Sequence, residues 1–124
     1  MSQPYDQRGQ TAAPAALPVT TTFEFPEWKV DRHVGSCFGL IVRSMGALKG
    51  LGAAFKTIKG GEVTQYTELL EDSRRHAMDR MVENARRMGA NAIVGMRFDS
   101  SEIGESLTEI VAYGTAVVVS TREG

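Results

Sequence analysis

Residues 64–98 constrain the fold more than any other stretch, because a long amphipathic segment is followed there by a glycine and an apolar run. Apolar or small side chains recur three and four residues apart, a spacing that places them on one face of an α-helix. They are Tyr66, Leu69, Leu70, Ser73, Ala77, Met81, Ala85 and Met88. Thr64 is suited to cap the start of this helix, and Gly89 supplies the left-handed residue that ends it. The stretch predicts one long helix that buries a single face.

Two segments after this helix have the pattern of buried strands. Ala90–Phe98 is apolar with little polar alternation, and Thr108–Thr121 is mostly apolar on both of its alternating rows. Strands of this kind are covered on both faces of a sheet. The long helix can cover one face of a small sheet, but the chain has little left to cover the other. The sequence therefore predicts a homo-oligomer whose subunits cover one another.

The first part of the chain divides into a tail and several extended pieces. Residues 1–19 contain three of the four prolines and no periodicity, so they predict a disordered tail, or alternatively a docking peptide. Residues 20–124 are expected to form a single α+β domain. Short strands are predicted at Thr20–Phe25 and Trp28–Val30, and a longer strand at Val34–Ser44.

The remaining elements complete the predicted order strand, strand, helix, helix, strand, strand. Gly35 and Gly39 in the longer strand indicate a bulge or a close approach of another backbone. Residues 45–58 have apolar side chains at helical spacing and predict a short helix, while Asp99–Ser106 has the composition of a polar loop. This order predicts an α+β fold in which one long and one short helix cover one face of a mostly antiparallel sheet.

The composition narrows the classes of function. The net charge of −1 and the charged fraction of 23% do not indicate a nucleic-acid binder or an acidic tail. Cys37 is the single cysteine, which excludes an intrachain disulfide and a zinc cage built from several thiolates of one chain. Neither a signal peptide nor an apolar run of the ~18 residues that a membrane span needs is present, so a cytoplasmic setting without a membrane partner is expected.

One segment is strongly basic, since residues 32–61 contain five lysines and arginines and no acid. We interpret it as a solvated face, or as a face that meets the acidic part of a neighbouring subunit. The alternative is an anion or nucleic-acid patch, but only Phe38 and Phe55 could stack on bases, and both have core-like positions. Nucleic acid is therefore not an expected partner.

Several short motifs occur together along the chain. They are Phe38-Gly39-Leu40-Ile41-Val42, Gly60-Gly61, Tyr66, Leu69, Arg74, Ala77, Met88-Gly89-Ala90-Asn91-Ala92-Ile93-Val94-Gly95 and Gly114-Thr115-Ala116-Val117. In this combination, over about Thr21–Val119, the chain resembles the YbjQ family. The resemblance implies a small α+β subunit similar to that of the dodecins, assembled as a ring that is a pentamer or a pair of pentamers. It implies no established enzymatic activity and carries over no functional residue, and the family is commonly labelled heavy-metal-binding.

The candidate metal ligands are His33 and Cys37, because imidazole and thiolate bind divalent or soft metal ions. Residues four apart on a strand lie roughly 13 Å from each other, so one chain is not expected to bring both to one ion. A ring could gather copies of them at its axis. The alternative interpretation is a buried thiol and a surface imidazole. A divalent or soft metal ion is the cofactor that these two residues suggest.

Other candidate sites lack the partners that their chemistry requires. His76 is expected on the solvated face of the long helix, and Met78, Met81 and Met88 are expected in the core. Residues 50–57 depart from a phosphate-binding loop because Phe55 stands where the loop needs glycine. Acids gather around the polar loop with no recognisable nucleophile or base beside them. These acids are Glu102, Glu105 and Glu109.

The sequence favours a non-enzymatic, homo-oligomeric scaffold or binding protein, built on a pentameric ring. The first alternative is a heavy-metal-binding protein with His33 and Cys37 as ligands. The second is a binder of a small aromatic or anionic ligand at a subunit interface, through the basic segment Lys49–Lys59, by fold analogy with the dodecins. No catalytic residue is identified.

Overall fold

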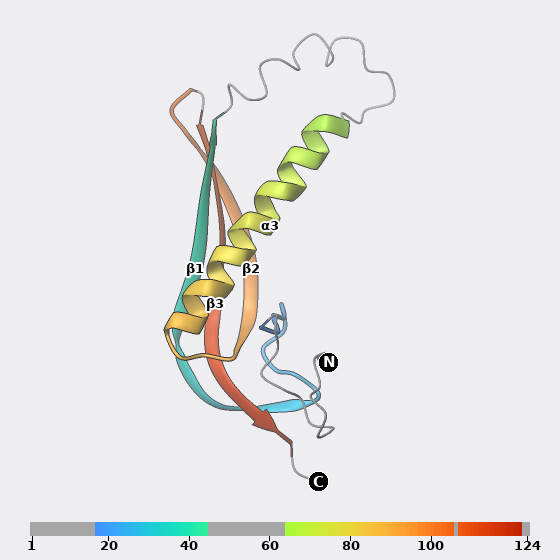
Figure 1. Cartoon of the computed structure of the whole chain (residues 1–124), viewed down its shortest axis with the longest axis vertical. Coiled ribbons are helices and arrows are strands. Elements are labelled where there is room, and N and C mark those ends of the chain that lie inside the picture. Colours follow the sequence, from blue (N-terminus) through green and yellow to red (C-terminus); the bar gives the residue numbers. More distant parts are fainter. Residues whose placement is uncertain (1–16, 45–63, 106, 123–124) are drawn as a thin grey trace.

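The computed structural model describes residues 17–44, 64–105 and 107–122. Its elements in chain order are β1 (Trp28–Ser44), α3 (Thr64–Arg87), β2 (Ala92–Ile103) and β3 (Leu107–Thr121). The strands form one antiparallel sheet in the order β1–β3–β2, and α3 crosses one face of it obliquely (Figure 1). The predicted α+β class and antiparallel sheet are confirmed. The short helix predicted at residues 45–58 lies outside the described residues.

The helix α3 has the bounds that its sequence predicts. It begins at Thr64 and ends at Arg87, and Gly89 follows with a φ of 91°. The central positions of the predicted apolar face are fully buried, and they are Ser73, Ala77, Met81 and Ala85. Leu70 and Met88, toward its ends, are exposed instead. The helix therefore packs on the sheet mainly through its second half.

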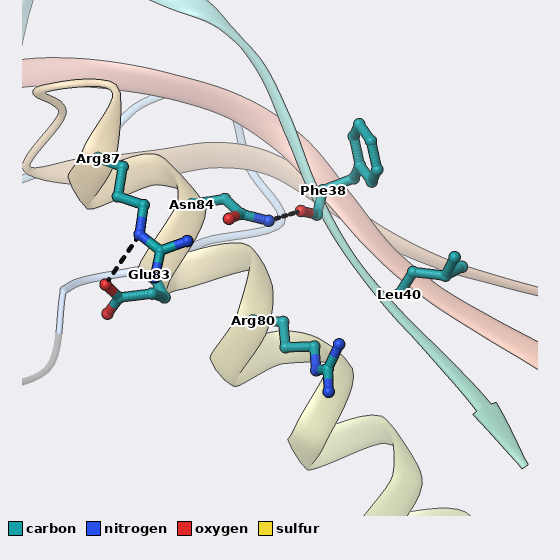
Figure 2. Close-up of a pocket in the computed structure, with 6 residues that line it drawn as sticks. All are labelled: Phe38, Leu40, Arg80, Glu83, Asn84 and Arg87. Carbon is teal, nitrogen blue, oxygen red and sulfur yellow. Dashed lines mark hydrogen bonds and ion pairs between the residues drawn. The ribbon is translucent and has the colours of Figure 1, made fainter.

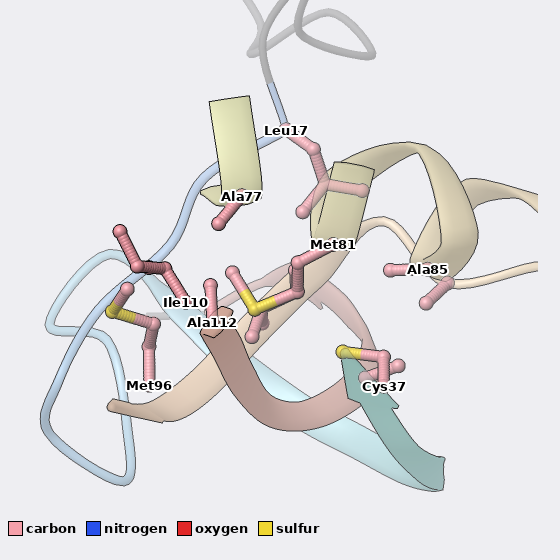
Figure 3. Packing of buried hydrophobic residues seen from close by; sticks show 11 residues of the cluster. Leu17, Cys37, Ala77, Met81, Ala85, Met96, Ile110 and Ala112 are labelled. Carbon is pink, nitrogen blue, oxygen red and sulfur yellow. The ribbon is translucent and has the colours of Figure 1, made fainter. Parts of the chain in front are cut away.

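The main core lies between α3 and the face of the sheet that it crosses, here called the helix face. The Met81 side chain is at its centre and lies among Cys37 of β1 and Ile110 and Ala112 of β3 (Figure 3). The small residues Ala77 and Ala85 on either side of Met81 let the helix approach the sheet closely. Of the three helix methionines predicted in the core, Met81 is fully buried and Met78 packs against the core while partly exposed, which confirms the prediction for these two. The prediction is wrong for Met88, which lies beyond the end of α3 and is exposed.

The strand β1 is one continuous element of 17 residues. The prediction of separate pieces at Trp28–Val30 and Val34–Ser44 is wrong, because two bulges keep the polar residues between them paired with β3. The register shifts between Val30 and Arg32 and again between His33 and Gly35. Gly35 has a φ of 153°, a conformation that favours glycine, so the bulge predicted there is confirmed.

Gly39 is where α3 comes closest to the sheet. A Cβ atom added at Gly39 would overlap the Ala77 carbonyl oxygen and the Met81 amide nitrogen of α3. Only a residue without a side chain allows the helix backbone to lie directly on β1 at this point. The close backbone approach predicted for this glycine is confirmed.

The strand predicted at Thr20–Phe25 is wrong. Residues 17–25, here called the N-terminal segment, instead cross the outer edge of β2 from one face of the sheet to the other. Val19 makes a single parallel bridge to Ile93, and the Gly95 N–H donates to the Thr22 C=O at 2.8 Å. The Thr22 hydroxyl group donates to the Glu24 C=O at 2.9 Å and bends the chain, which explains why the strand does not form.

The polar loop predicted at Asp99–Ser106 is also wrong over most of its length. β2 continues to Ile103, and its pairing with β3 runs from Asp99 opposite Val111 to Ile103 opposite Leu107. The turn follows at Gly104, which has a φ of 67°. The polar side chains of residues 99–102 point into solvent, so the composition of this segment is that of a loop. Its pairing with β3 nevertheless makes it a strand.

Candidate functional site

The face of the sheet opposite α3, here called the open face, is covered at one end and uncovered at the other. At the covered end, Phe25 and Trp28 pack edge to face at 5.3 Å between ring centroids and shield Val94 and Val117. Phe25 reaches this position because the N-terminal segment has crossed the edge of β2. Val117 is fully buried as a result.

At the end of the sheet near the β2–β3 turn, the open face carries a row of exposed apolar side chains. The register places them on the same side, because residues directly opposite one another on paired strands share a face. These residues, here called the apolar band, are Phe38, Leu40, Val42, Ile103, Leu107 and Tyr113. Their exposed fractions range from 36% to 59%, and no described residue covers them. Apolar surface that gathers in this way marks an interaction site.

Two adjoining grooves run between α3 and the outer edge of β1. The first has a volume of about 450 Å³ and is lined by Phe38, Leu40, Arg80, Glu83, Asn84 and Arg87 (Figure 2). The second, of about 470 Å³, is lined by residues 40–43 together with His76 and Arg80. Arg80 and Leu40 line both grooves, so one wall is cationic and the other apolar.

The polar side chains in the first groove are partly engaged. Arg87 pairs with Glu83 at 3.4 Å, and the Asn84 side-chain amide donates to the Phe38 C=O at 2.7 Å (Figure 2). The side chain of Arg80 has no hydrogen bond or ion pair with any residue in the described part of the chain. A guanidinium group in that state is available to a carboxylate from outside the subunit.

The guanidinium group of Arg43 links β1 to α3 through hydrogen bonds. Its Nε donates to the Ser73 Oγ at 2.8 Å, and one terminal nitrogen lies 3.1 Å from the Asp72 carboxylate. The same nitrogen lies 3.1 Å from the Nδ1 of His76, which is half-exposed. His76 therefore has a contact with β1 that its place on the solvated helix face did not indicate. The sequence signal was absent because Arg43 and His76 are far apart in the chain.

Ser73, His76 and Asp72 are the residue types of a hydrolytic triad, but their arrangement does not support that chemistry. The Ser73 hydroxyl group is fully buried and donates its proton to the Leu69 C=O at 2.8 Å. It also accepts a hydrogen bond from Arg43. His76 is therefore not placed to take its proton, and the buried oxygen cannot reach a substrate as a nucleophile. The cluster holds the helix to the strand.

His33 and Cys37 do not come together within one subunit. His33 pairs with Val117 on the open face, whereas Cys37 pairs with Gly114 on the helix face, because the bulge between them reverses the alternation. The Cys37 thiol is buried and donates to the Gly114 C=O at 3.6 Å. Burial raises the pKa of this thiol, which opposes the thiolate form that metals bind. These two residues of a single subunit do not fit a metal site.

The other predicted candidates remain dispersed. The acids Glu102 and Glu105 are exposed near the β2–β3 turn, and Glu109 accepts a hydrogen bond from the Ser101 hydroxyl group at 3.0 Å. Within the described ranges, no three His, Cys, Asp or Glu side chains gather around a potential metal position. Of the basic segment, Arg32 and Arg43 are described, and the stretch Lys49–Lys59 lies outside the described residues. No described helix is long and apolar enough to cross a membrane.

Comparison with known proteins adds the family. The chain is 54% identical over 101 residues to a UPF0145 protein of Bradyrhizobium sp. (strain ORS 278), covering 82% of this chain and 91% of that protein. It is 47% identical over 106 residues to a UPF0145 protein of Methanoregula boonei, covering 86% and 88%.

A solved structure shows the same fold. It is a protein of unknown function from the DUF74 family of Pediococcus pentosaceus ATCC 25745, with a TM-score of 0.53 and 10% sequence identity, covering 82% of this chain and 96% of that one. Residues 17–120 also match the family model YbjQ_1, which is described as "Putative heavy-metal-binding". On this match and on the identity to its relatives, the chain belongs to the YbjQ family.

Proposed function

We propose that this protein acts as a homo-oligomeric scaffold or binding protein without a catalytic step, built as a pentamer-based ring. The observation that carries the proposal is the apolar band, six large apolar side chains that no described residue of the same subunit covers. A monomer that exposed them together would lose the free energy of their burial and would tend to associate. A second copy of the chain is the simplest cover for them.

The charge distribution supports association between copies. The groove of about 470 Å³ beside β1 is lined by Arg43 and Arg80, and β2, at the other edge of the sheet, carries the exposed Glu102. A surface that is cationic at one place and acidic at another favours contacts between unlike patches, which is the kind of contact from which rings are built. The pentameric number rests on the resemblance to ring-forming YbjQ proteins.

The proposal is tested by measuring the mass of the assembly at micromolar concentration, with light scattering and native mass spectrometry. Tyr113→Glu places a charge in the apolar band on the central strand, and we expect it to dissociate the assembly because the carboxylate would be buried at the interface. Leu70→Glu on α3 is the matched control, since Leu70 is about equally exposed but lies outside the band. A wild-type monomer would overturn the proposal.

A second candidate function is heavy-metal binding, which the description of the matching family model supports. A site would need ligands from several copies, because His33 and Cys37 of one subunit face opposite sides of the sheet. Zinc and copper(I) titrations of the wild type and a Cys37→Ala variant, followed by native mass spectrometry, test it. Equal metal uptake by both proteins would remove Cys37 as a ligand.

A further inference from the structure

On each outer edge of the sheet, outward backbone groups are hydrogen-bonded to the rest of the described chain only toward the covered end. On β1, the Asn84 side-chain amide donates a hydrogen bond to the Phe38 C=O, which points away from β3. On β2, the N-terminal segment hydrogen-bonds to the backbone of residues 93–96. Beyond these points, toward the β2–β3 turn, no described segment pairs with the outer edge of residues 40–43 or of residues 98–102. Within the described part of the chain, β1 and β2 thus each have an unpaired outer edge toward the β2–β3 turn.

The direction of the backbone groups on each open edge follows from the contacts at its closed end. The Phe38 C=O points outward to Asn84, and the direction alternates along a strand, so the N–H and C=O groups of Leu40 and Val42 also point outward. On β2, the Ser100 N–H donates to the neighbouring Asp99 carboxylate at 2.8 Å, which places it outside the ladder to β3. Ser100 and its alternate neighbour Glu102 therefore face outward as well.

The two open edges also lie at the same height in the sheet. Val111 of β3 pairs with Leu40 on one side and with Asp99 on the other. Thr108 likewise pairs with both Arg43 and Glu102. Because β1 and β2 are each antiparallel to β3, they are parallel to each other. Consider two copies related by a rotation about an axis that runs along the strands. The β1 edge of one copy then meets the β2 edge of the next, with the strands parallel and at the same height.

We infer that the open edge of β1 pairs in parallel with the open edge of β2 from a neighbouring copy of this chain, so that the sheet continues from subunit to subunit. This inference rests on the proposed oligomeric function and names its interface. In this register Leu40 is level with Asp99 of the neighbouring copy, and Val42 with its Ser101. The outward groups alternate correctly for a parallel ladder, in which Leu40 bonds to the residues on either side of Asp99. The contact is heterologous, and it gives a ring when the rotation between neighbouring copies closes on itself.

Charge complementarity favours a second copy as the occupant of this edge. Glu102 shares the helix face with Arg43, because both pair with Thr108. Level pairing would place the neighbour's Glu102 at the groove of about 470 Å³, where Arg80 has no partner among the described residues. On the open face, the same pairing would join the apolar bands of the two subunits. One register thus accounts for the outward backbone groups and the unpaired cation, and a ring that closes with the open face inward would enclose the joined apolar bands.

Disulfide trapping tests this register directly. Val42→Cys and Ser101→Cys, combined in a Cys37→Ala background, lie level on opposite sides of β3, roughly two strand spacings or ~9.6 Å apart. A disulfide needs Cα atoms about 4.4–6.8 Å apart, so the two cysteines cannot bridge within one subunit. Between neighbouring copies they would be adjacent. We expect mild oxidation to give a ladder of covalent multimers that ends at the subunit number of the ring. Each single variant is the control and cannot extend beyond a dimer.

Charge reversal tests the predicted ion pair. Arg80→Glu and Glu102→Arg should each raise the dissociation constant of the assembly by about tenfold or more, and the double variant should restore most of the affinity. Asp79→Arg and Glu105→Arg are matched controls, because both acids are exposed near the mutated positions but outside the groove and the ladder. A third variant, Ser100→Pro, removes one outward N–H and should weaken assembly while Ser100→Ala should not.

The outcomes separate this inference from the function it rests on. A monomeric wild type would overturn both. An assembled wild type that gives no covalent ladder and tolerates both charge reversals would overturn the edge pairing and leave the oligomer in place. If Ser100→Pro lowers the melting temperature of the subunit without changing assembly, the edge is occupied by the subunit's own chain, and the inference is wrong. A ladder together with rescue by the double variant would establish the interface.

Discussion

The two ends of the sheet consist of the same strands but differ in how much of the open face is covered. At the covered end, the N-terminal segment brings Phe25 onto the open face, and Val94 and Val117 are buried beneath it. At the end near the β2–β3 turn, the equivalent face exposes Phe38 and Tyr113. The helix face is packed, while the open face is packed at the covered end only.

This difference shows which surfaces of the sheet the described residues of one chain cover and which they leave open. A three-stranded sheet has two faces and two edges. Among the described residues, α3 and the N-terminal segment cover one face, part of the other face, and part of each edge. The uncovered face and the open edges coincide at one end of the molecule. In the proposed assembly, this coincidence would place the uncovered face and both open edges within one interface.

The largest expected effect is the loss of the helix from the sheet. In Gly39→Ala, the new Cβ would overlap the backbone of α3 at Ala77 and Met81, and backbone cannot move aside as a side chain can. We expect a loss of about 3 kcal/mol in the free energy of unfolding, or failure to fold, measured by urea denaturation. Ser36→Ala, at an exposed position of the same strand, is the control. Wild-type stability in Gly39→Ala would contradict the packing of α3 on β1.

The second prediction compares two phenylalanines at the two ends. Phe25→Ala removes a buried ring at the covered end and should cost the isolated subunit about 3 kcal/mol, because the cavity is lined by Trp28 and Val117. Phe38→Ala removes an exposed ring and should change the stability of the subunit by less than about 0.5 kcal/mol. It should instead weaken assembly. Urea denaturation of the dissociated subunit measures the change in stability, and light scattering measures the change in assembly. Equal effects of the two variants on stability would contradict the difference between the two ends.

The elements that the sequence predicted are those specified by local pattern. The bounds of α3 followed from its apolar spacing and from Gly89, and the special roles of Gly35 and Gly39 followed from glycines within a strand pattern. Each signal lies within a few residues of the structure that it specifies. The family could also be identified from short motifs in order along the chain.

The elements that the sequence missed depend on partners far along the chain. Residues 99–103 form a strand because β3 pairs with them, although their composition is that of a loop. The path of the N-terminal segment depends on hydrogen bonds to residues 93–96, about 75 positions away. The contact of Arg43 with Ser73 spans 30 positions. The grooves beside α3 could not be predicted, because they exist only once β1 and α3 are packed.

A smaller effect is expected where β1 is fastened to α3. Ser73→Ala leaves the Nε of Arg43 without its acceptor in a partly buried place, which should cost about 1–2 kcal/mol. Because this contact lies at the end of the sheet near the turn, its loss should raise hydrogen exchange there more than at the covered end. Ser36→Ala, at an exposed position of β1, is the control, and uniform exchange along the sheet in Ser73→Ala would contradict the local role.

The smallest effect concerns Cys37, and its sign bears on the metal hypothesis. Burial raises the pKa of the folded thiol above its ordinary value of 9.0, so above that pH the unfolded chain releases a proton that the folded chain retains. Stability should therefore fall with pH, by at most about 1.4 kcal/mol per pH unit, from the ordinary pKa up to the raised one. Compared with Cys37→Ala, the wild type should lose more stability in urea denaturation between about pH 8 and pH 10. A thiol held as a thiolate for metal binding would have a lowered pKa, and the stability of the wild type would then rise with pH from the lowered pKa to the ordinary one. The slope thus decides whether Cys37 is a core residue of the helix face or a ligand.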